Sequence, residues 1–86
     1  MRVIAVDMDG VLTIPENVQI VNKLAHMREN LIIVYTARGP WHREQTERQL
    51  QNIGVHYHQL IMGKLKADYY VDDRSTDLEN LLEICR

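Results

Sequence analysis

Apolar runs alternate with amphipathic stretches along this chain. The stretches 2–7 and 31–36 have uninterrupted apolar centres, a pattern typical of strands that are buried on both faces of a parallel sheet. Residues 55–62 and 67–71 are more mixed or shorter, and we expect them to form a third and a fourth strand. Strands that are separated by helices in this way predict an α/β fold with right-handed crossovers.

The stretches between the first three strands are predicted to be helices, the first amphipathic and the second polar except for Leu50 and Ile53. Residues 15–29 place their apolar side chains on one face, and Thr13 with Glu16 matches a capping box that would start this helix. Pro40 can open a second helix, which Gly54 is suited to end. Each of these helices would connect one strand to the next.

The end of the chain predicts a third helix. Thr76 and Glu79 match a second capping box, and the apolar residues after it recur at helical spacing. The residues that would face the core are Leu78, Leu81, Leu82 and Cys85. We therefore expect a three-layer, Rossmann-like parallel sheet of about four strands, built as a single domain over residues 1–86.

Composition and charge narrow the function classes. Apolar residues make up 45% of the chain and charged residues 26%, which is ordinary for a globular domain. The net charge of −2 does not favour a nucleic-acid partner, because such partners are held largely through phosphate contacts. Cys85 is the single cysteine, which excludes an internal disulfide and favours a reducing compartment. No segment approaches the ~18 apolar residues of a membrane span, so we expect a cytoplasmic protein.

Acidic and hydroxyl side chains follow the ends of the expected strands. Asp7 and Asp9 end the first strand, Thr36 ends the second, and Asp72 with Asp73 follows the fourth. Acids are weak strand formers, and a buried carboxylate is costly unless something binds it. The carboxyl ends of parallel strands meet at one edge of a sheet, where ligands bind. These five side chains are therefore predicted to converge.

The predicted cluster suits a phosphoryl group and a hard cation. Crowded carboxylates repel one another, and a divalent cation removes that penalty. Oxygen ligands with few protein donors favour Mg²⁺. Lys64, or else Lys66, adds an amine that can neutralise phosphoryl oxygens. One carboxylate could then act as a nucleophile, and the acid two residues on as a general acid and base.

In its motifs the chain resembles the haloacid dehalogenase (HAD) superfamily. The matching residues are Asp7-Met8-Asp9-Gly10-Val11-Leu12-Thr13, Thr36, Lys64 and Asp72-Asp73, which together resemble the four signature motifs of that superfamily. The segments Tyr35-Thr36-Ala37-Arg38-Gly39, Gly63-Lys64 and Asp72-Asp73-Arg74 are similar to a small subgroup labelled capsule-biosynthesis or phage HAD phosphatases. The function that this resemblance implies is a Mg²⁺-dependent phosphomonoester hydrolase that acts through an aspartyl-phosphate.

The resemblance also implies roles for the acidic residues. Asp7 would be the nucleophile, and Asp9 the general acid and base. Mg²⁺ would be held by Asp7, by the backbone carbonyl of Asp9, and by the pair Asp72 and Asp73. We expect Asp72 to coordinate directly and Asp73 to act through water, although the order of these two is open.

The same resemblance assigns the phosphate-binding residues. Thr36, with Ala37 and Arg38, would bind the transferring phosphoryl group, and Lys64 would steady it. For Arg38 two roles are open, namely binding the substrate phosphate or pairing with a nearby acid. The chain departs from the subgroup at Leu65, where proline is usual after the motif lysine.

The resemblance leaves the substrate open. The chain has no room for the cap domain that commonly closes such sites, so a bulky substrate or a second subunit of a homo-oligomer would have to close this one. We expect a small-molecule phosphate ester, either a sugar phosphate or a nucleotide. Trp41 either grips a base or sugar ring of this substrate or is a partly exposed residue at a helix start. We expect no catalytic role for His26, His56 or His58.

Other function classes fit less well. In a phospho-acceptor receiver domain the phosphorylated Asp ends the third strand, whereas here that strand ends in residues 60–63, which hold no acid. A non-catalytic regulatory or binding module of HAD-like fold would be marked by the loss of Asp7 or Asp9, and both are present. Nucleotide-binding P-loop and dinucleotide fingerprints are absent from the sequence.

Overall fold

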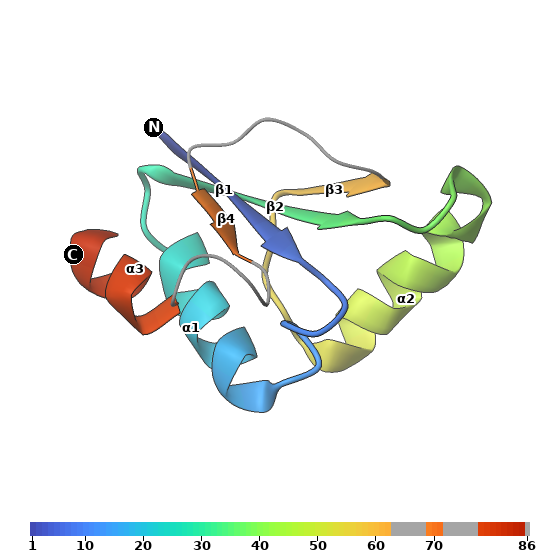
Figure 1. Cartoon of the computed structure of the whole chain (residues 1–86), viewed down its shortest axis with the longest axis horizontal. Helices are drawn as coiled ribbons and strands as arrows, with labels where there is room; N and C mark the ends of the chain where they lie inside the picture. Colours follow the sequence, from blue (N-terminus) through green and yellow to red (C-terminus); the bar gives the residue numbers. More distant parts are fainter. Residues whose placement is uncertain (63–68, 72–77, 86) are drawn as a thin grey trace.

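The protein is an α/β structure in which helices pack on a small parallel sheet (Figure 1). The computed structural model describes residues 1–62, 69–71 and 78–85. Its elements in chain order are β1 (Arg2–Asp7), α1 (Pro15–Ala25), β2 (Asn30–Thr36), the 3₁₀ helix η1 (Pro40–His42), α2 (Arg43–Ile53), β3 (Gln59–Met62), β4 (Tyr69–Val71) and α3 (Leu78–Cys85). None of the helices in these ranges has the length and apolar character needed to cross a membrane.

The strands lie side by side in the order β3-β2-β1-β4, and every pairing is parallel. At the carboxyl end of the sheet, Asp7 lies opposite Tyr35, and Thr36 lies opposite Met62. This register brings the last residues of β1, β2 and β3 to a common edge. The parallel α/β organisation that the apolar runs predict is therefore confirmed.

The described helices lie on one side of the sheet (Figure 1). The steps from β1 to β2 and from β2 to β3 go in the same direction across the sheet, so right-handed crossovers place α1 and α2 on the same face. Helix α3 packs against α1. The described elements thus form two layers, and the third layer that we expected is not among them.

The hydrophobic core fills the space between the sheet and the helices. Alternate strand residues face this core, and α1 and α3 each contribute an apolar stripe. Its fully or almost fully buried members include Ile4, Val6, Ile32, Val34, Leu60, Val18, Val21, Leu24, Leu78, Leu81 and Leu82. On the opposite face of the sheet, Ala5 and Ile33 are also buried. The centres of β1 and β2 are therefore buried on both sides, as their uninterrupted apolar runs predict.

Helix α1 begins where it was predicted to begin, but its N-terminal cap and its last residue differ from the prediction. It begins at Pro15 with Ile14 as the N-cap residue and no side-chain cap, so the predicted capping box of Thr13 and Glu16 is wrong. The fixed φ of proline suits a first helical turn without such a cap. The helix ends at Ala25, before the predicted end, and the buried side chain of Asn30 donates a hydrogen bond of 3.1 Å to the Leu24 carbonyl at this terminus.

The third strand is shorter than predicted, because a side chain replaces part of its ladder. His58 donates its N–H to the Ile32 carbonyl at 2.9 Å, and its ring Nδ1 accepts the Ile32 N–H at 2.9 Å. Regular pairing begins only at Gln59. Helix α2 ends as predicted at Gly54, whose φ of 82° is the left-handed conformation that glycine favours. The second predicted capping box depends on Thr76, which lies outside the described residues.

Candidate active site

The loop after β1 is anchored on both sides of Asp9. Asp7 is half-buried as the last residue of the strand, and the next residue, Met8, is buried and donates its N–H to the Tyr35 carbonyl at 3.1 Å. Gly10 has a φ of 85°, which turns the chain, and Leu12 is buried and donates its N–H to the Met8 carbonyl at 3.0 Å. The buried neighbours hold the loop, while 58% of the Asp9 side chain stays exposed.

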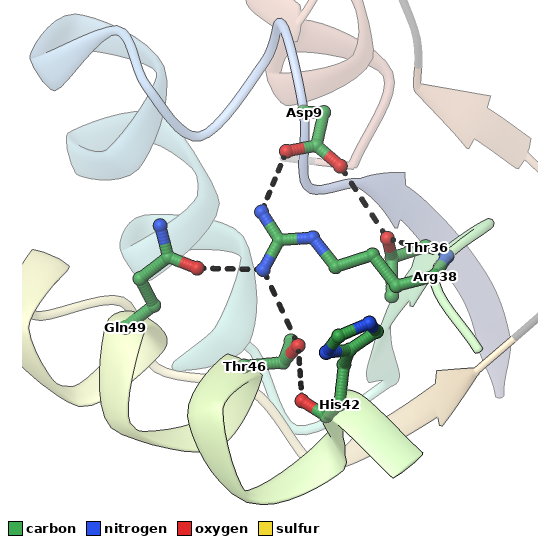
Figure 2. Close-up of polar contacts among 6 residues, drawn as sticks. All are labelled: Asp9, Thr36, Arg38, His42, Thr46 and Gln49. Carbon is green, nitrogen blue, oxygen red and sulfur yellow. Dashed lines mark hydrogen bonds and ion pairs between the residues drawn. The ribbon is translucent and has the colours of Figure 1, made fainter. Parts of the chain in front are cut away.

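Thr36 and Asp9 meet at the carboxyl edge of the sheet. The Thr36 hydroxyl lies 3.4 Å from Oδ2 of Asp9, to which it can donate, and it accepts the N–H of Arg38 at 3.3 Å (Figure 2). Thr36 is fully buried, so its hydroxyl is held in this position by the surrounding chain. The sequence predicted that the ends of β1 and β2 would converge, and these two side chains do so.

Arg38 pairs with the second acid of the motif. Its Nη2 lies 2.9 Å from Oδ1 of Asp9, so the two oxygens of that carboxylate face Arg38 and Thr36 respectively (Figure 2). Of the two roles left open for Arg38, the structure shows the acid pairing, and binding of the substrate phosphate stays a prediction. Because the pair is partly exposed, it adds at most about 1 kcal/mol to folding. The contact mainly orients the Asp9 carboxylate.

Helix α2 supplies the residues that hold the guanidinium group. Arg38 Nη1 donates to Oε1 of Gln49 at 2.6 Å and to the Thr46 hydroxyl at 3.3 Å. Thr46 is fully buried, and its hydroxyl donates to the His42 carbonyl at 2.8 Å (Figure 2). Sequence reasoning missed Thr46 and Gln49. The available signal was their three-residue spacing, which places both on one face of the helix that follows Thr36.

Two hollows border this group of residues. A depression of about 330 Å³ is lined by Arg38, His42, Gln45 and Gln49, all of them polar. Gln49 also borders a largely apolar groove of about 690 Å³ between α1 and α2, whose other lining residues include Leu12 and Ile53. Space for a bound group therefore exists on the α2 side of Arg38.

Of the residues near the start of α2, Trp41 is exposed, whereas Arg43 has partners within the fold. Trp41 is 81% exposed, and its ring lies against Gly39, where an added Cβ would overlap it. Arg43 is used within the fold, because it donates to the Leu60 carbonyl at 3.0 Å and pairs with Glu47 at 2.9 Å. The exposed indole is consistent with either role predicted for Trp41.

The structure describes only part of the predicted site. Ala37 is exposed beside Thr36, and Asp7 lies one strand away. The predicted residues Lys64, Asp72 and Asp73 lie outside the described residues. Within the described ranges, no group of three or more His, Cys, Asp or Glu side chains is placed to hold a metal ion. Two of the four expected carboxylates are not in those ranges.

No family model, curated protein or solved structure matches this chain.

Proposed function

We propose that the protein is a Mg²⁺-dependent phosphomonoester hydrolase of the HAD superfamily, with a minimal, capless, Rossmann-like core. The observation that carries the proposal is the approach of the Thr36 hydroxyl to the Asp9 carboxylate at 3.4 Å, at the edge where β1 ends in Asp7. An acid pair and a buried hydroxyl on adjacent parallel strands suit phosphoryl transfer, which depends on positioning and charge stabilisation.

In the proposed reaction, Asp7 is the nucleophile and Asp9 is the general acid and base. A carboxylate oxygen of Asp7 attacks phosphorus, the bond to the leaving oxygen breaks, and Asp9 gives that oxygen a proton. Asp9 then takes a proton from water as the water oxygen attacks the phosphorus of the aspartyl-phosphate. This second step releases inorganic phosphate and restores the Asp7 carboxylate.

Arg38 couples substrate binding to the availability of Asp9 in this scheme. A guanidinium group binds phosphate at least as well as carboxylate, so an arriving phosphate dianion competes with Asp9 for it. A phosphoryl oxygen that takes the place of Oδ2 of Asp9 would accept the hydrogen bond of the Thr36 hydroxyl in the same way. Gln49 and Thr46 keep the guanidinium in place while its partner changes.

Mg²⁺ fits the chemistry of the proposed donor set. The carboxylate of Asp7 and the backbone carbonyl of Asp9 provide the hard oxygen ligands that this ion prefers, and Asp72 with Asp73 would complete them. When bound, the ion neutralises phosphoryl oxygens as charge develops in the transition state.

The surroundings of Arg38 favour a small-molecule phosphate ester. The open depression beside Arg38 is lined by amide and imidazole groups, which can form hydrogen bonds with a sugar or a nucleoside. Because α1 begins at Pro15, soon after the Asp9 loop, the described chain offers no cap at that point. A second copy or the substrate itself would exclude water.

A panel of phosphate esters tests the proposal directly. With Mg²⁺ present, the wild-type protein should release phosphate from an aryl phosphate and from at least one sugar phosphate or nucleotide. Asp7→Asn should abolish release, and Asp9→Asn should slow it by about 10²–10⁴. Thermal unfolding of both variants should match wild type. Full activity of Asp7→Asn would overturn the proposal. Stable phosphorylation of Asp7 without turnover would instead favour a phospho-acceptor module.

A further inference from the structure

Two histidine rings meet at the opposite edge of the sheet from Asp7. Nε2 of His26 lies 3.1 Å from Nδ1 of His56, and the ring centroids are 5.1 Å apart with an interplanar angle of 78°. His26 follows the last residue of α1, and His56 precedes β3, so both lie where the strands begin. Both side chains are exposed to solvent.

Asn22 holds the backbones of both histidines. Its side-chain oxygen accepts the His56 N–H at 2.6 Å, and its side-chain nitrogen donates to the Gly54 carbonyl at 3.1 Å. Its backbone carbonyl accepts the His26 N–H at 3.2 Å. The two rings therefore meet because one residue of α1 fixes the end of its own helix and also the segment that leads into β3.

The facing ring nitrogens lie within hydrogen-bond distance of each other. Between two neutral imidazoles, a single proton can lie on the line from Nε2 of His26 to Nδ1 of His56, and two cationic rings would repel each other. A bound cation of the transition series would accept both lone pairs at once. Neutral imidazole is the commonest protein ligand for such ions.

We propose that His26 and His56 form a binding site for a divalent transition-metal ion such as Zn²⁺ or Ni²⁺. With metal–nitrogen bonds of about 2.0–2.1 Å, the separation of 3.1 Å corresponds to an N–metal–N angle of about 98°. This angle lies between those of octahedral and tetrahedral coordination, so small ring rotations bring both lone pairs onto one ion. Water completes the coordination, and the ion exchanges readily.

The site ties α1 to the segment before β3. A ligand that binds only the folded chain stabilises it by RT ln(1 + [L]/Kd), and this ion bridges two segments 30 residues apart in sequence. The site is independent of the proposed hydrolase, because it uses neither Asp7 nor Asp9. Mg²⁺ prefers oxygen ligands and does not compete for the imidazoles.

The test is titration of the chelator-stripped full chain with ZnCl₂ or NiCl₂, followed by calorimetry and thermal unfolding. Wild type should bind one ion saturably and unfold at a higher temperature with it. His26→Gln and His56→Gln should each weaken binding at least about tenfold, since one imidazole remains. His42→Gln, at another exposed histidine, is the matched control and should bind like wild type.

A second experiment distinguishes metal binding at the two histidines from metal binding at the carboxylates. Asp7→Asn should keep the full Zn²⁺ and Ni²⁺ response, and the ring resonances of His26 and His56 in wild type should shift together on titration. Equal binding by wild type and both glutamine variants, or loss of the response in Asp7→Asn, would overturn the proposal. Absence of saturable binding to wild type would overturn it as well.

Discussion

Helices α1 and α2 have the same number of residues but serve the molecule differently. Helix α1 buries Val18, Val21 and Leu24 in the core and packs against both β2 and α3. Helix α2 buries only Thr46 and Leu50. The difference shows that one helix supplies hydrophobic stability, whereas the other mainly carries polar contacts.

The polar contacts of α2 reach both neighbouring strands. At its start, Arg43 donates to the carbonyl of Leu60 in β3. One turn on, Thr46 and Gln49 hold Arg38, which follows β2 and pairs with Asp9. Leu50 anchors this helix in the core, and the polar contacts join it to the carboxyl ends of β2 and β3. Through Arg38, α2 contributes to the arrangement of side chains at the carboxyl edge of the sheet.

Replacement of the buried leucine in each helix should give the largest effects, and the two variants should differ in their effect on activity. Leu24→Ala and Leu50→Ala each empty a fully buried site, so each should lower the free energy of unfolding by about 2–5 kcal/mol. In the proposed hydrolase, only Leu50→Ala should also lower kcat/KM per folded molecule, since it disturbs the helix that holds Arg38. Denaturant unfolding and phosphate release measure the two quantities. Equal loss of activity in both variants would remove the distinction between the helices.

Replacing Arg38 should affect activity more than stability. In the proposed hydrolase, Arg38→Gln removes the guanidinium group that orients Asp9 before substrate arrives and then binds the phosphate, so kcat/KM should fall by about 10- to 100-fold. The free energy of unfolding should change by no more than about 1 kcal/mol, because the ion pair is partly exposed. Arg38→Lys should not restore activity, since an ammonium group cannot contact Asp9 and Gln49 with a planar fork. A large loss of stability with unchanged kcat/KM would show that the contact is structural.

Replacement of Gln49 should lower kcat/KM by less than replacement of Arg38. Gln49→Ala removes the 2.6 Å contact to Arg38 but leaves the Thr46 hydroxyl, so kcat/KM should fall by about three- to tenfold. The matched control is Gln51→Ala, an exposed position on the same helix, which should match wild type in phosphate release. If both alanine variants behave alike, α2 does not act on the site through Gln49.

The smallest effect should come from Trp41, outside both helices. In Trp41→Ala, KM for the physiological ester should rise by about threefold, whereas turnover of a small aryl phosphate should barely change. A small ester lacks the remote group that the exposed indole would contact. Equal loss for the two substrates would assign Trp41 to the packing against Gly39 and not to substrate recognition.

Patterns of apolar residues and the glycine cap at Gly54 predicted the elements better than the capping box at Thr13 did. The strand ends at Asp7 and Thr36 followed from apolar runs interrupted by polar residues, and parallel topology then predicted their convergence. The predicted capping box at Thr13 was wrong because α1 begins at Pro15 without a side-chain cap. The predicted length of β3 was wrong because the ring of His58 accepts a hydrogen bond from the Ile32 N–H. A pattern of apolar and polar residues does not reveal such a contact.

The contacts of Arg38 with Thr46 and Gln49 could not be predicted from the sequence, because they too depend on packing. Thr46 and Gln49 are ordinary polar residues on a polar helix, and only the packing of α2 beside the end of β2 brings them to the guanidinium group. Asp9 and Arg38 were both singled out from the sequence, but their pairing was one of two open alternatives. The predicted roles of Lys64, Asp72 and Asp73 remain predictions.

The central claim, that Asp7 forms a covalent phosphoryl intermediate, is tested most directly by trapping that intermediate. An aryl phosphate needs little help from a general acid to leave, so Asp9→Asn should form the aspartyl-phosphate and hydrolyse it slowly. Acid quenching during turnover, followed by peptide mass spectrometry, should find the phosphoryl group on Asp7 in Asp9→Asn. The Asp7→Asn/Asp9→Asn double variant should carry none. Phosphate release without a phosphoryl group on the chain, or with the group on another residue, would contradict the account.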